Sequence, residues 1–162
     1  MKMKYTWMES PVGKLLLARD EAGLRSVSFE TSNRAEVVRD DWVKDEAALK
    51  EAVRQLRDYF AGELREFDLE LAPVGTEFQL RVWKALRAIP YGETISYGEL
   101  ARRVGNIKAS RAVGLANGCN PIAIIVPCHR VIGSDGSLTG FGGGLRNKEI
   151  LLELESGQGR LL

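Results

Sequence analysis

The feature that most restricts the fold of this chain is a run of five apolar residues, Ile122 to Val126, enclosed by two prolines. A continuous apolar run of this length, rich in β-branched residues, is typical of a strand buried on both faces. Pro127 has no backbone N–H to give to a sheet and must end the strand. We therefore expect Cys128 to lie at the terminus of a buried strand.

Cys128 is followed directly by His129 and Arg130. The thiolate is the reactive form of cysteine, and both neighbours can favour a negative charge. Adjacent side chains of a strand point to opposite faces, so a contact between Cys128 and His129 requires a backbone turn, which Pro127 permits. The pair alone is weak evidence for catalysis, because a free cysteine is usually a small buried hydrophobic residue. We interpret Cys119 in that structural way.

Length and composition limit the classes of protein to consider. The 162 residues, 44% hydrophobic and 28% charged, suit one ordinary domain or two small packed units. No apolar run approaches the roughly 20 residues of a membrane-spanning helix, and no signal-peptide pattern is seen, so we expect a cytoplasmic protein without membrane contact. Two cysteines and one histidine form neither a disulfide framework nor a zinc site, and we expect no metal.

Residues 1–74 read as a strand-rich N-terminal domain. Alternating patterns and turn residues predict strands at 5–9, 13–18 and 24–30, which form a small antiparallel meander. Helical periodicity predicts a helix over 46–60, and alternation predicts another strand at 67–71. The segment 72–75, Ala-Pro-Val-Gly, resembles a linker and sets the boundary with a second domain at residues 75–162.

The second domain reads as mostly helical. Thr76 and Gln79 form a capping-box pattern that starts a helix ending near residue 88, and Ser96 and Glu99 form another that starts a short helix. A further helix is expected over 109–117, so the two short helices predict a helix-turn-helix. A last helix is expected over 147–155. The fold class is α+β.

The charge of the chain is distributed unevenly. Residues 1–74 carry 12 basic and 15 acidic side chains, whereas residues 75–162 carry 11 and 7. Between Leu100 and Ser134 there are five basic residues and no acidic one. This segment can face a polyanion, although charge alone fits a solvated basic face equally well.

Several motifs together resemble the O6-alkylguanine-DNA alkyltransferase family. The first is Pro127-Cys128-His129-Arg130 with apolar flanks. The others, collinear from about residue 76 to 155, are Asn120-Pro121, Ile89-Pro90-Tyr91-Gly92-Glu93, Ser96-Tyr97, Ser110-Arg111-Ala112-Val113-Gly114 and the glycine-rich Gly140-Phe141-Gly142-Gly143-Gly144. The resemblance implies a ribonuclease H-like N-terminal domain of sheet and helix, and a winged-helix-like C-terminal domain. Residues 1–74 carry no diagnostic motif.

The resemblance also implies catalytic roles. Cys128 accepts the alkyl group, and His129 draws off the thiol proton through a bridging water, oriented by Glu155. Tyr97 donates a proton to the purine as the alkyl group leaves, and Asn120 forms hydrogen bonds near the thiol. Taken singly, Glu155 also fits an exposed helix end, Tyr97 a packing residue, and Asn120 a turn initiator.

Further residues are assigned to DNA by the same resemblance. Arg111 is the finger that fills the stack after the nucleotide is flipped out, with a phosphate contact as the alternative. The small residues of the recognition helix suit close approach to the minor groove; these small residues are Ser110, Ala112 and Gly114. Tyr97 and Arg130 are further DNA-binding residues. Small residues packed against a neighbouring helix are the alternative. The alkyl pocket is bordered by Phe141, Gly142 and Gly143.

The expected activity is direct-reversal DNA repair, an irreversible single-turnover transfer of an alkyl group from O6-alkylguanine in double-stranded DNA to Cys128. O4-alkylthymine is a plausible second substrate. No cofactor is needed, and no heptad pattern favours an oligomer, so we expect a monomer. The alternatives are a helix-turn-helix regulator or lesion sensor that performs no transfer, and a cysteine hydrolase. The first leaves Cys128 and His129 unexplained.

Overall fold

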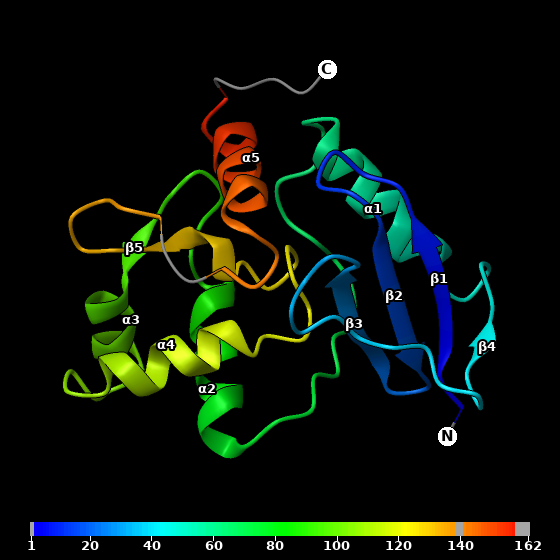
Figure 1. The fold of residues 1–162 in the computed structure, drawn as a ribbon, viewed down its shortest axis with the longest axis horizontal. Coiled ribbons are helices and arrows are strands. Elements are labelled where there is room, and N and C mark those ends of the chain that lie inside the picture. Colours follow the sequence, from blue (N-terminus) through cyan, green and yellow to red (C-terminus); the bar gives the residue numbers. More distant parts are fainter. Residues whose placement is uncertain (1, 139–140, 158–162) are drawn as a thin grey trace.

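The structure is a computed structural model that describes residues 2–138 and 141–157. Figure 1 shows a sheet with helix α1 on one side of the molecule and a group of helices on the other. Helix α5 lies near the boundary between these two parts. The predicted α+β class is confirmed.

The sheet contains four strands in the order β3-β2-β1-β4. Strands β1 (Lys4–Met8), β2 (Leu15–Asp20) and β3 (Gly23–Phe29) form the expected antiparallel meander. The short strand β4 (Val43–Lys44), which the sequence did not predict, runs parallel to β1. Both inner strands bury apolar side chains, so the sheet forms one wall of the core.

Two predictions in the N-terminal half need correction. Helix α1 (Lys50–Phe60) begins four residues later than expected. The segment 67–71 is not a strand, and only Leu71 forms a bridge, to Leu24. Gly23 explains the close approach, because a Cβ atom there would lie 2.8 Å from the carbonyl oxygen of Glu70. Strand β3 therefore meets this segment at one point and not along a ladder.

The C-terminal half begins with helix α2 (Glu77–Arg87), whose capping box between Thr76 and Gln79 is present as predicted. Helix α3 (Tyr97–Arg103) is capped by the Ser96 hydroxyl, which accepts a hydrogen bond from the Glu99 amide. Helix α4 (Ser110–Gly118) packs against α2 and α3. Helices α3 and α4 form the expected helix-turn-helix, beside a two-stranded parallel pair, β5 (Ile95–Ser96) and β6 (Val131–Ile132).

The apolar run 122–126 is buried as predicted, but it is not a strand. Ile122 bridges Val27 of β3, and the chain then turns, with Ile124 at a φ of 73°. The Asn120 side chain causes this turn, because its Oδ1 accepts from the Ile122 amide at 3.0 Å and its Nδ2 donates to the Val126 carbonyl at 2.8 Å. Side-chain hydrogen bonds thus replace a sheet ladder.

Helix α5 (Leu145–Ser156) closes the described chain and ends at Gly157, which has the left-handed φ of 76°. It begins two residues before the predicted start. Buried residues of both halves form a single hydrophobic core that includes Leu17, Leu56, Val82 and Leu151. Among the described residues, none of the helices has the length and apolar character needed to cross a membrane.

Candidate active site

Cys128 begins a short 3-10 helix, η1 (Cys128–Arg130), and not a strand terminus as the sequence predicted. The Cys128 amide donates to the Val126 carbonyl at 2.8 Å, and the intervening Pro127 has φ −83° and ψ 66°. These angles define an inverse γ-turn, which the fixed φ of proline favours. Because of this turn, the Cys128 and His129 side chains do not point to opposite faces as they would in a strand.

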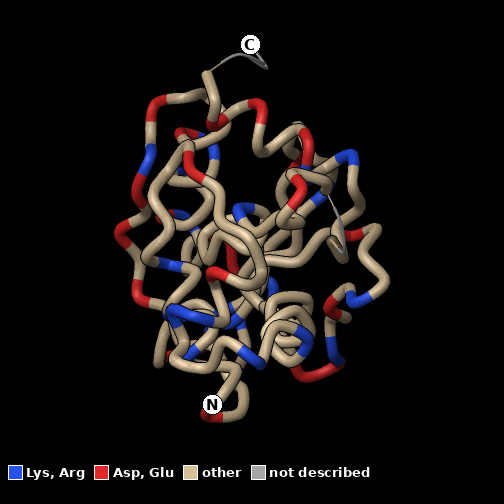
Figure 2. The backbone as a smooth tube through the Cα atoms, turned by 90° about the vertical axis from the view of Figure 1, so that its left-hand side faces the viewer, with Lys and Arg blue, Asp and Glu red and all other residues tan. Residues whose placement is uncertain are grey.

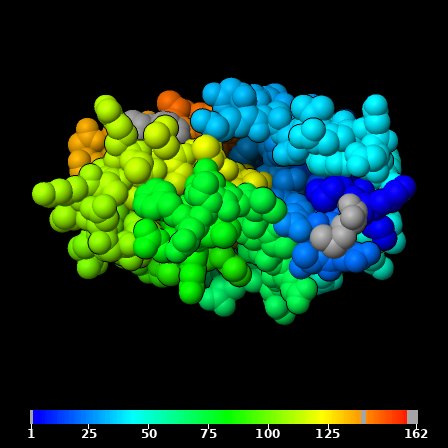
Figure 3. Space-filling model, turned by 90° about the horizontal axis from the view of Figure 1, so that it is seen from below, coloured from blue at the N-terminus to red at the C-terminus, as the bar shows by residue number. Residues whose placement is uncertain are grey.

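Cys128 lines a cavity of about 250 Å³ between the two halves of the chain. Phe141, Gly142 and Gly143 line the same cavity, as do Asn120 and Cys119. Figure 3 shows a hollow between the light-blue segment around residue 30 and the yellow segment around residue 120. Gly140, the first residue of the predicted glycine-rich loop, lies outside the described residues.

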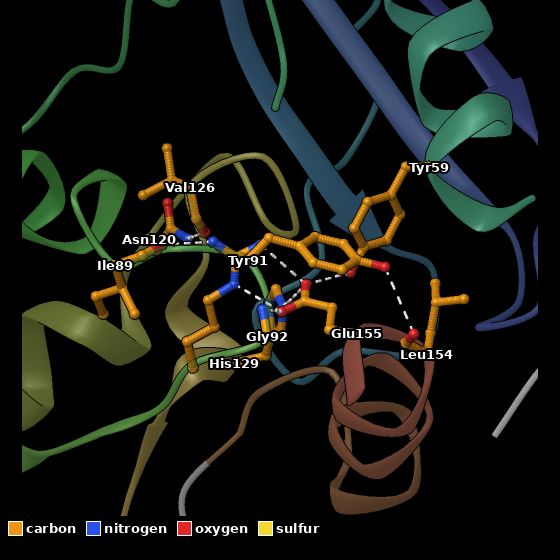
Figure 4. Close-up of polar contacts among 10 residues, drawn as sticks. Tyr59, Ile89, Tyr91, Gly92, Asn120, Val126, His129, Leu154 and Glu155 are labelled. Carbon is orange, nitrogen blue, oxygen red and sulfur yellow. Dashed lines mark hydrogen bonds and ion pairs between the residues drawn. The ribbon is translucent and has the colours of Figure 1, made fainter. Parts of the chain in front are cut away.

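The Glu155 carboxylate is the centre of a buried hydrogen-bond network (Figure 4). Its Oε2 atom lies 2.7 Å from His129 Nε2 and accepts from the Tyr59 hydroxyl at 2.5 Å. Arg130 donates from Nε to Oε1 at 2.7 Å and from Nη2 to Oε2 at 3.0 Å. The Gly92 amide also donates to Oε1, at 3.5 Å. Helix α1, the segment at Gly92, η1 and helix α5 therefore meet at one carboxylate.

These contacts determine the proton positions. Burial raises the pKa of Glu155, but hydrogen bonds and charge from His129 and Arg130 overcome it and lower the pKa to about 2. Burial lowers the pKa of His129, against the opposing effect of Glu155. Histidine is therefore neutral beside an ionised carboxylate, which can only accept, so Nε2 carries the proton. His129 Nδ1, buried and without a hydrogen-bond partner among the described residues, holds the free lone pair.

Burial also raises the pKa of the Cys128 thiol. A hydrogen bond from Asn120 and the positive charge of Lys148 act in the opposite direction but do not overcome it. The resting side chain is therefore a thiol and not a standing thiolate. A base must remove its proton before it can react.

Arg130 differs from its prediction as a DNA contact. Its side chain is buried, and its three nitrogens donate to Glu155 and, at 2.6 Å, to the Ile89 carbonyl. The guanidinium also lies 5.7 Å from the centre of the Tyr91 ring. Arg130 therefore acts inside the protein, where its charge balances that of Glu155.

Sequence reasoning missed Tyr59 and Lys148. Tyr59 reads as one more apolar position on the face of α1, and only the packing of α1 near α5 places its hydroxyl against Glu155. Lys148 reads as a solvated lysine, yet it is fully buried and donates from Nζ to the Val131 carbonyl at 2.6 Å. No local pattern distinguishes either residue from its ordinary neighbours.

The exposed face of α4 carries the predicted DNA contacts. Arg111 and Ala112 are exposed, and Ser110 and Gly114 are half-buried. A Cβ atom on Gly114 would lie 3.8 Å from Tyr97 Cδ1, so the Tyr97 ring packs against the small face of α4. Neither Tyr97 nor Arg111 is among the described residues that line the Cys128 cavity.

The basic segment between Leu100 and Ser134 is less positive than its sequence suggests. Arg102 and Arg103 both form ion pairs with Glu99, at 2.6 and 2.8 Å. Among the described residues, Lys108 and Arg111 form no ion pair. Figure 2 shows basic and acidic segments interspersed over the backbone. The positive charge of the helix-turn-helix that no acidic side chain pairs is therefore limited to Lys108 and Arg111.

The described part of the chain contains no group of three or more His, Cys, Asp or Glu side chains that could hold a metal ion. The fold and site thus define a two-part α+β protein in which a buried Cys-His-Glu arrangement lies beside a helix-turn-helix. Comparison with known proteins gives this class a family.

Two family models match the chain. Residues 3–73 match the ribonuclease-like domain of 6-O-methylguanine DNA methyltransferase, and residues 77–157 match its DNA-binding domain. The methylated-DNA–protein-cysteine methyltransferase of Methanosarcina acetivorans is 61% identical over 153 residues, which cover 94% of this chain and 98% of that protein. The Mycobacterium tuberculosis protein of the same description is 57% identical over 151 residues, covering 93% and 91%.

A solved structure agrees with these matches. The crystal structure of Mycobacterium tuberculosis OGT in complex with DNA superposes with a TM-score of 0.91 at 54% identity, covering 98% of this chain and 96% of that one. The chain belongs to the 6-O-methylguanine DNA methyltransferase family. The family resemblance inferred from the sequence is confirmed.

Proposed function

We propose that this chain repairs alkylated DNA by direct reversal, transferring the alkyl group from O6 of guanine to Cys128 Sγ. The observation that carries the proposal is the placement of the Cys128 thiol in a cavity, directly followed by a neutral histidine that Glu155 orients. The names of the relatives describe the same reaction. Cys128 is present, which argues against a lesion sensor without an acceptor.

The first step is removal of the thiol proton. His129 Nδ1 takes the proton from Cys128 through a bridging water, and the Nε2–H bond to Glu155 stabilises the imidazolium that forms. Arg130 and Tyr59 keep the carboxylate ionised and fixed. Because burial raises the pKa of Cys128, the side chain is a thiol before the reaction, and the thiolate forms only when His129 accepts the proton.

The second step is displacement at the alkyl carbon. The Sγ electron pair forms a bond to carbon while the carbon–O6 bond breaks and its electron pair goes to the purine. Tyr97 donates a proton to the purine, and the proton that His129 took from Cys128 replaces it on Tyr97 by way of water. The products are therefore unmodified guanine, a thioether on Cys128, and neutral His129 and Tyr97. No bond to an acyl or phosphoryl group is available for hydrolysis, and each molecule therefore acts once.

The damaged base must leave the duplex to reach Cys128. We propose that α4 enters the minor groove with Ser110, Ala112 and Gly114 against the DNA, and that Arg111 fills the vacated stack. The exposure of Arg111 and Ala112, and the small size of Ser110 and Gly114, support this docking. Asn120 shapes the turn before Cys128, and Phe141 to Gly143 border the alkyl group.

Five further proposals complete this function. O4-alkylthymine is a second substrate, and no cofactor is required because the alkylated base carries its own electrophilic carbon. The protein acts as a monomer in the cytoplasm. Residues 1–74 and 75–162 form two domains, a division supported by family models that match on either side of this boundary.

The test is to incubate the protein with a duplex containing one O6-methylguanine and to measure the mass of the intact protein. We expect a gain of one methylene unit on Cys128, in proportion to the DNA supplied, and none in Cys128→Ala. Peptide mapping locates the modification. DNA binding with an unchanged protein mass would contradict the proposal, as would repeated turnover.

A further inference from the structure

The N-terminal half supplies one wall of the Cys128 cavity, although it contains no motif of the family. The lining residues from this half follow strand β3 and the loop after it: Ser26, Val27, Ser28, Phe29, Ser32, Arg34 and Glu36. In Figure 3 this wall is the light-blue side of the hollow. The loop that begins at Phe141 lines the same cavity and meets this wall at Phe29.

Phe29 is a residue of this wall that packs directly against the loop. Its side chain is buried, and its ring meets the Phe141 ring edge to face, with centres 5.6 Å apart. A Cβ atom on Gly143 would lie 2.6 Å from Phe29 Cδ2 and 2.9 Å from Phe141 Cε2. The loop therefore rests directly on the Phe29 ring, with no space between them.

Gly142 extends the same contact. A Cβ atom there would lie 3.4 Å from Ser32 Oγ and 3.5 Å from Asn33 Oδ1, both in the loop after β3. The segment 141–143 is thus held against the N-terminal half at successive residues. The volume left beside Cys128 depends on how far this contact lets the loop retreat.

We infer that Phe29 sets the upper size limit of the alkyl group that Cys128 accepts. This inference rests on the proposed function. Protein interiors are close-packed, so a smaller side chain at position 29 leaves space into which the Phe141 ring and the loop can move. A methyl group needs none of this space, whereas a benzyl group does. Phe29 therefore limits benzyl transfer and leaves methyl transfer nearly unchanged, so the ratio of the two rates reports its effect.

The test compares the rate constants of alkylation by duplexes containing O6-methylguanine and O6-benzylguanine. In Phe29→Leu we expect the benzyl-to-methyl ratio to rise about tenfold, the lower end of the discrimination that one or a few methylene groups provide in a pocket. Phe60→Leu is the matched control, since Phe60 is equally buried but lies on α1 and does not line the cavity. It should leave the ratio unchanged.

A second variant tests the same contact from the other side. Gly143 has a backbone φ outside the left-handed region, and the atoms nearest to an added Cβ belong to the Phe29 and Phe141 rings, so Gly143→Ala acts first on this contact. We expect it to lower the benzyl-to-methyl ratio in the wild-type background and to have a smaller effect beside Phe29→Leu. Circular dichroism verifies folding of each variant, and Gly143→Ala alone decides the matter if Phe29→Leu does not fold.

The outcomes separate the two proposals. A wild-type protein that gains no alkyl mass from either duplex contradicts the proposed function. A wild-type protein that gains mass, with a ratio unchanged in Phe29→Leu or in Gly143→Ala, overturns the role of Phe29. Additive effects in the double variant overturn it as well, because contacting residues should show coupling.

Discussion

The two halves of this chain contribute to one site in different ways. The C-terminal half supplies charged and reactive groups in recognisable motifs, and its His129, Arg130 and Glu155 are held by short hydrogen bonds. The N-terminal half supplies a wall of the cavity, in which the Phe29 ring packs against Phe141, and the Tyr59 hydroxyl that binds Glu155, with no motif around them. Groups that work by packing or by a single hydrogen bond leave little trace in a sequence.

The comparison also shows where the stability of the site lies. The C-terminal contribution is a buried ion pair, whose loss leaves an uncompensated charge away from water. The N-terminal contribution to the same carboxylate is neutral, and its loss leaves the charges balanced. The loss of stability on substitution should therefore be largest at the Glu155 carboxylate, smaller at the Tyr59 hydroxyl and smallest at the solvent-exposed surface.

Glu155→Gln should have the largest effect. The amide keeps the shape of the side chain but leaves the Arg130 charge buried without a counter-charge, which costs about 3–5 kcal/mol. His129 also loses the negative charge that stabilises its imidazolium, so the rate of alkyl transfer should fall at least about a hundredfold. Denaturant unfolding and the oligonucleotide assay measure the two effects.

The matched control is Glu153→Gln on the exposed face of the same helix. It should change the free energy of unfolding by less than about 0.5 kcal/mol. Equal effects of the two substitutions would refute the central position of Glu155 in this network.

The pH dependence of stability should follow the same network. The pKa of Glu155 falls from 4.5 to about 2 on folding, so its contribution is present above pH 4.5 and is lost as the pH falls toward 2. The shift corresponds to about 3 kcal/mol. The pKa of His129 is lowered from 6.5 because burial disfavours the cation, so unfolding takes up a proton and stability also falls as the pH drops below 6.5.

On the alkaline side the sign reverses. Burial raises the pKa of Cys128 from 9.0, so the unfolded thiol ionises first and stability falls above pH 9. Stability should therefore be greatest between about pH 6.5 and 9, as measured by denaturant unfolding across pH. Glu155→Gln should flatten the loss between pH 4.5 and 2; an unaltered loss there would assign it to other carboxylates.

Tyr59→Phe tests the N-terminal contribution to the carboxylate. Removing one donor to a charged acceptor should cost about 1.5–3 kcal/mol, less than Glu155→Gln. The rate of transfer should fall less than in that variant, because His129 and Arg130 still hold the carboxylate. Tyr5→Phe, in strand β1, is the control and should change neither quantity. A loss in Tyr59→Phe as large as in Glu155→Gln would remove the difference between the halves.

The parts of the structure that local chemistry controls are the parts that the sequence predicts. The helices that begin after Thr76 and Ser96 start as expected, because a capping side chain acts within three residues. The run 122–126 was wrongly predicted as a strand, since its turn depends on hydrogen bonds from the Asn120 side chain. Apolar composition predicts burial, but it does not choose between a buried strand and a buried turn.

The site was predictable to a similar extent. Glu155 follows Leu151 by one helical turn on α5, and both are buried as that spacing indicates. Tyr59 joins Glu155 across 96 positions of the chain, a distance over which no periodic pattern carries information. Arg130 follows His129 directly, and only the η1 helix turns it inward toward Glu155.

Arg111→Ala should have the smallest effect on the folded protein and a selective effect on DNA. Arg111 is exposed and forms no ion pair among the described residues, so the free energy of unfolding should change by less than about 0.5 kcal/mol. If its guanidinium enters the stack in place of the flipped nucleotide, alkylation of the protein by a duplex should slow far more than its alkylation by the free base O6-benzylguanine.

A phosphate contact of Arg111 would instead weaken binding to all duplexes equally and lower the slope of affinity against salt by about one. Arg57→Ala, the same change on α1, should alter neither measurement, because Arg57 is exposed and does not line the Cys128 cavity.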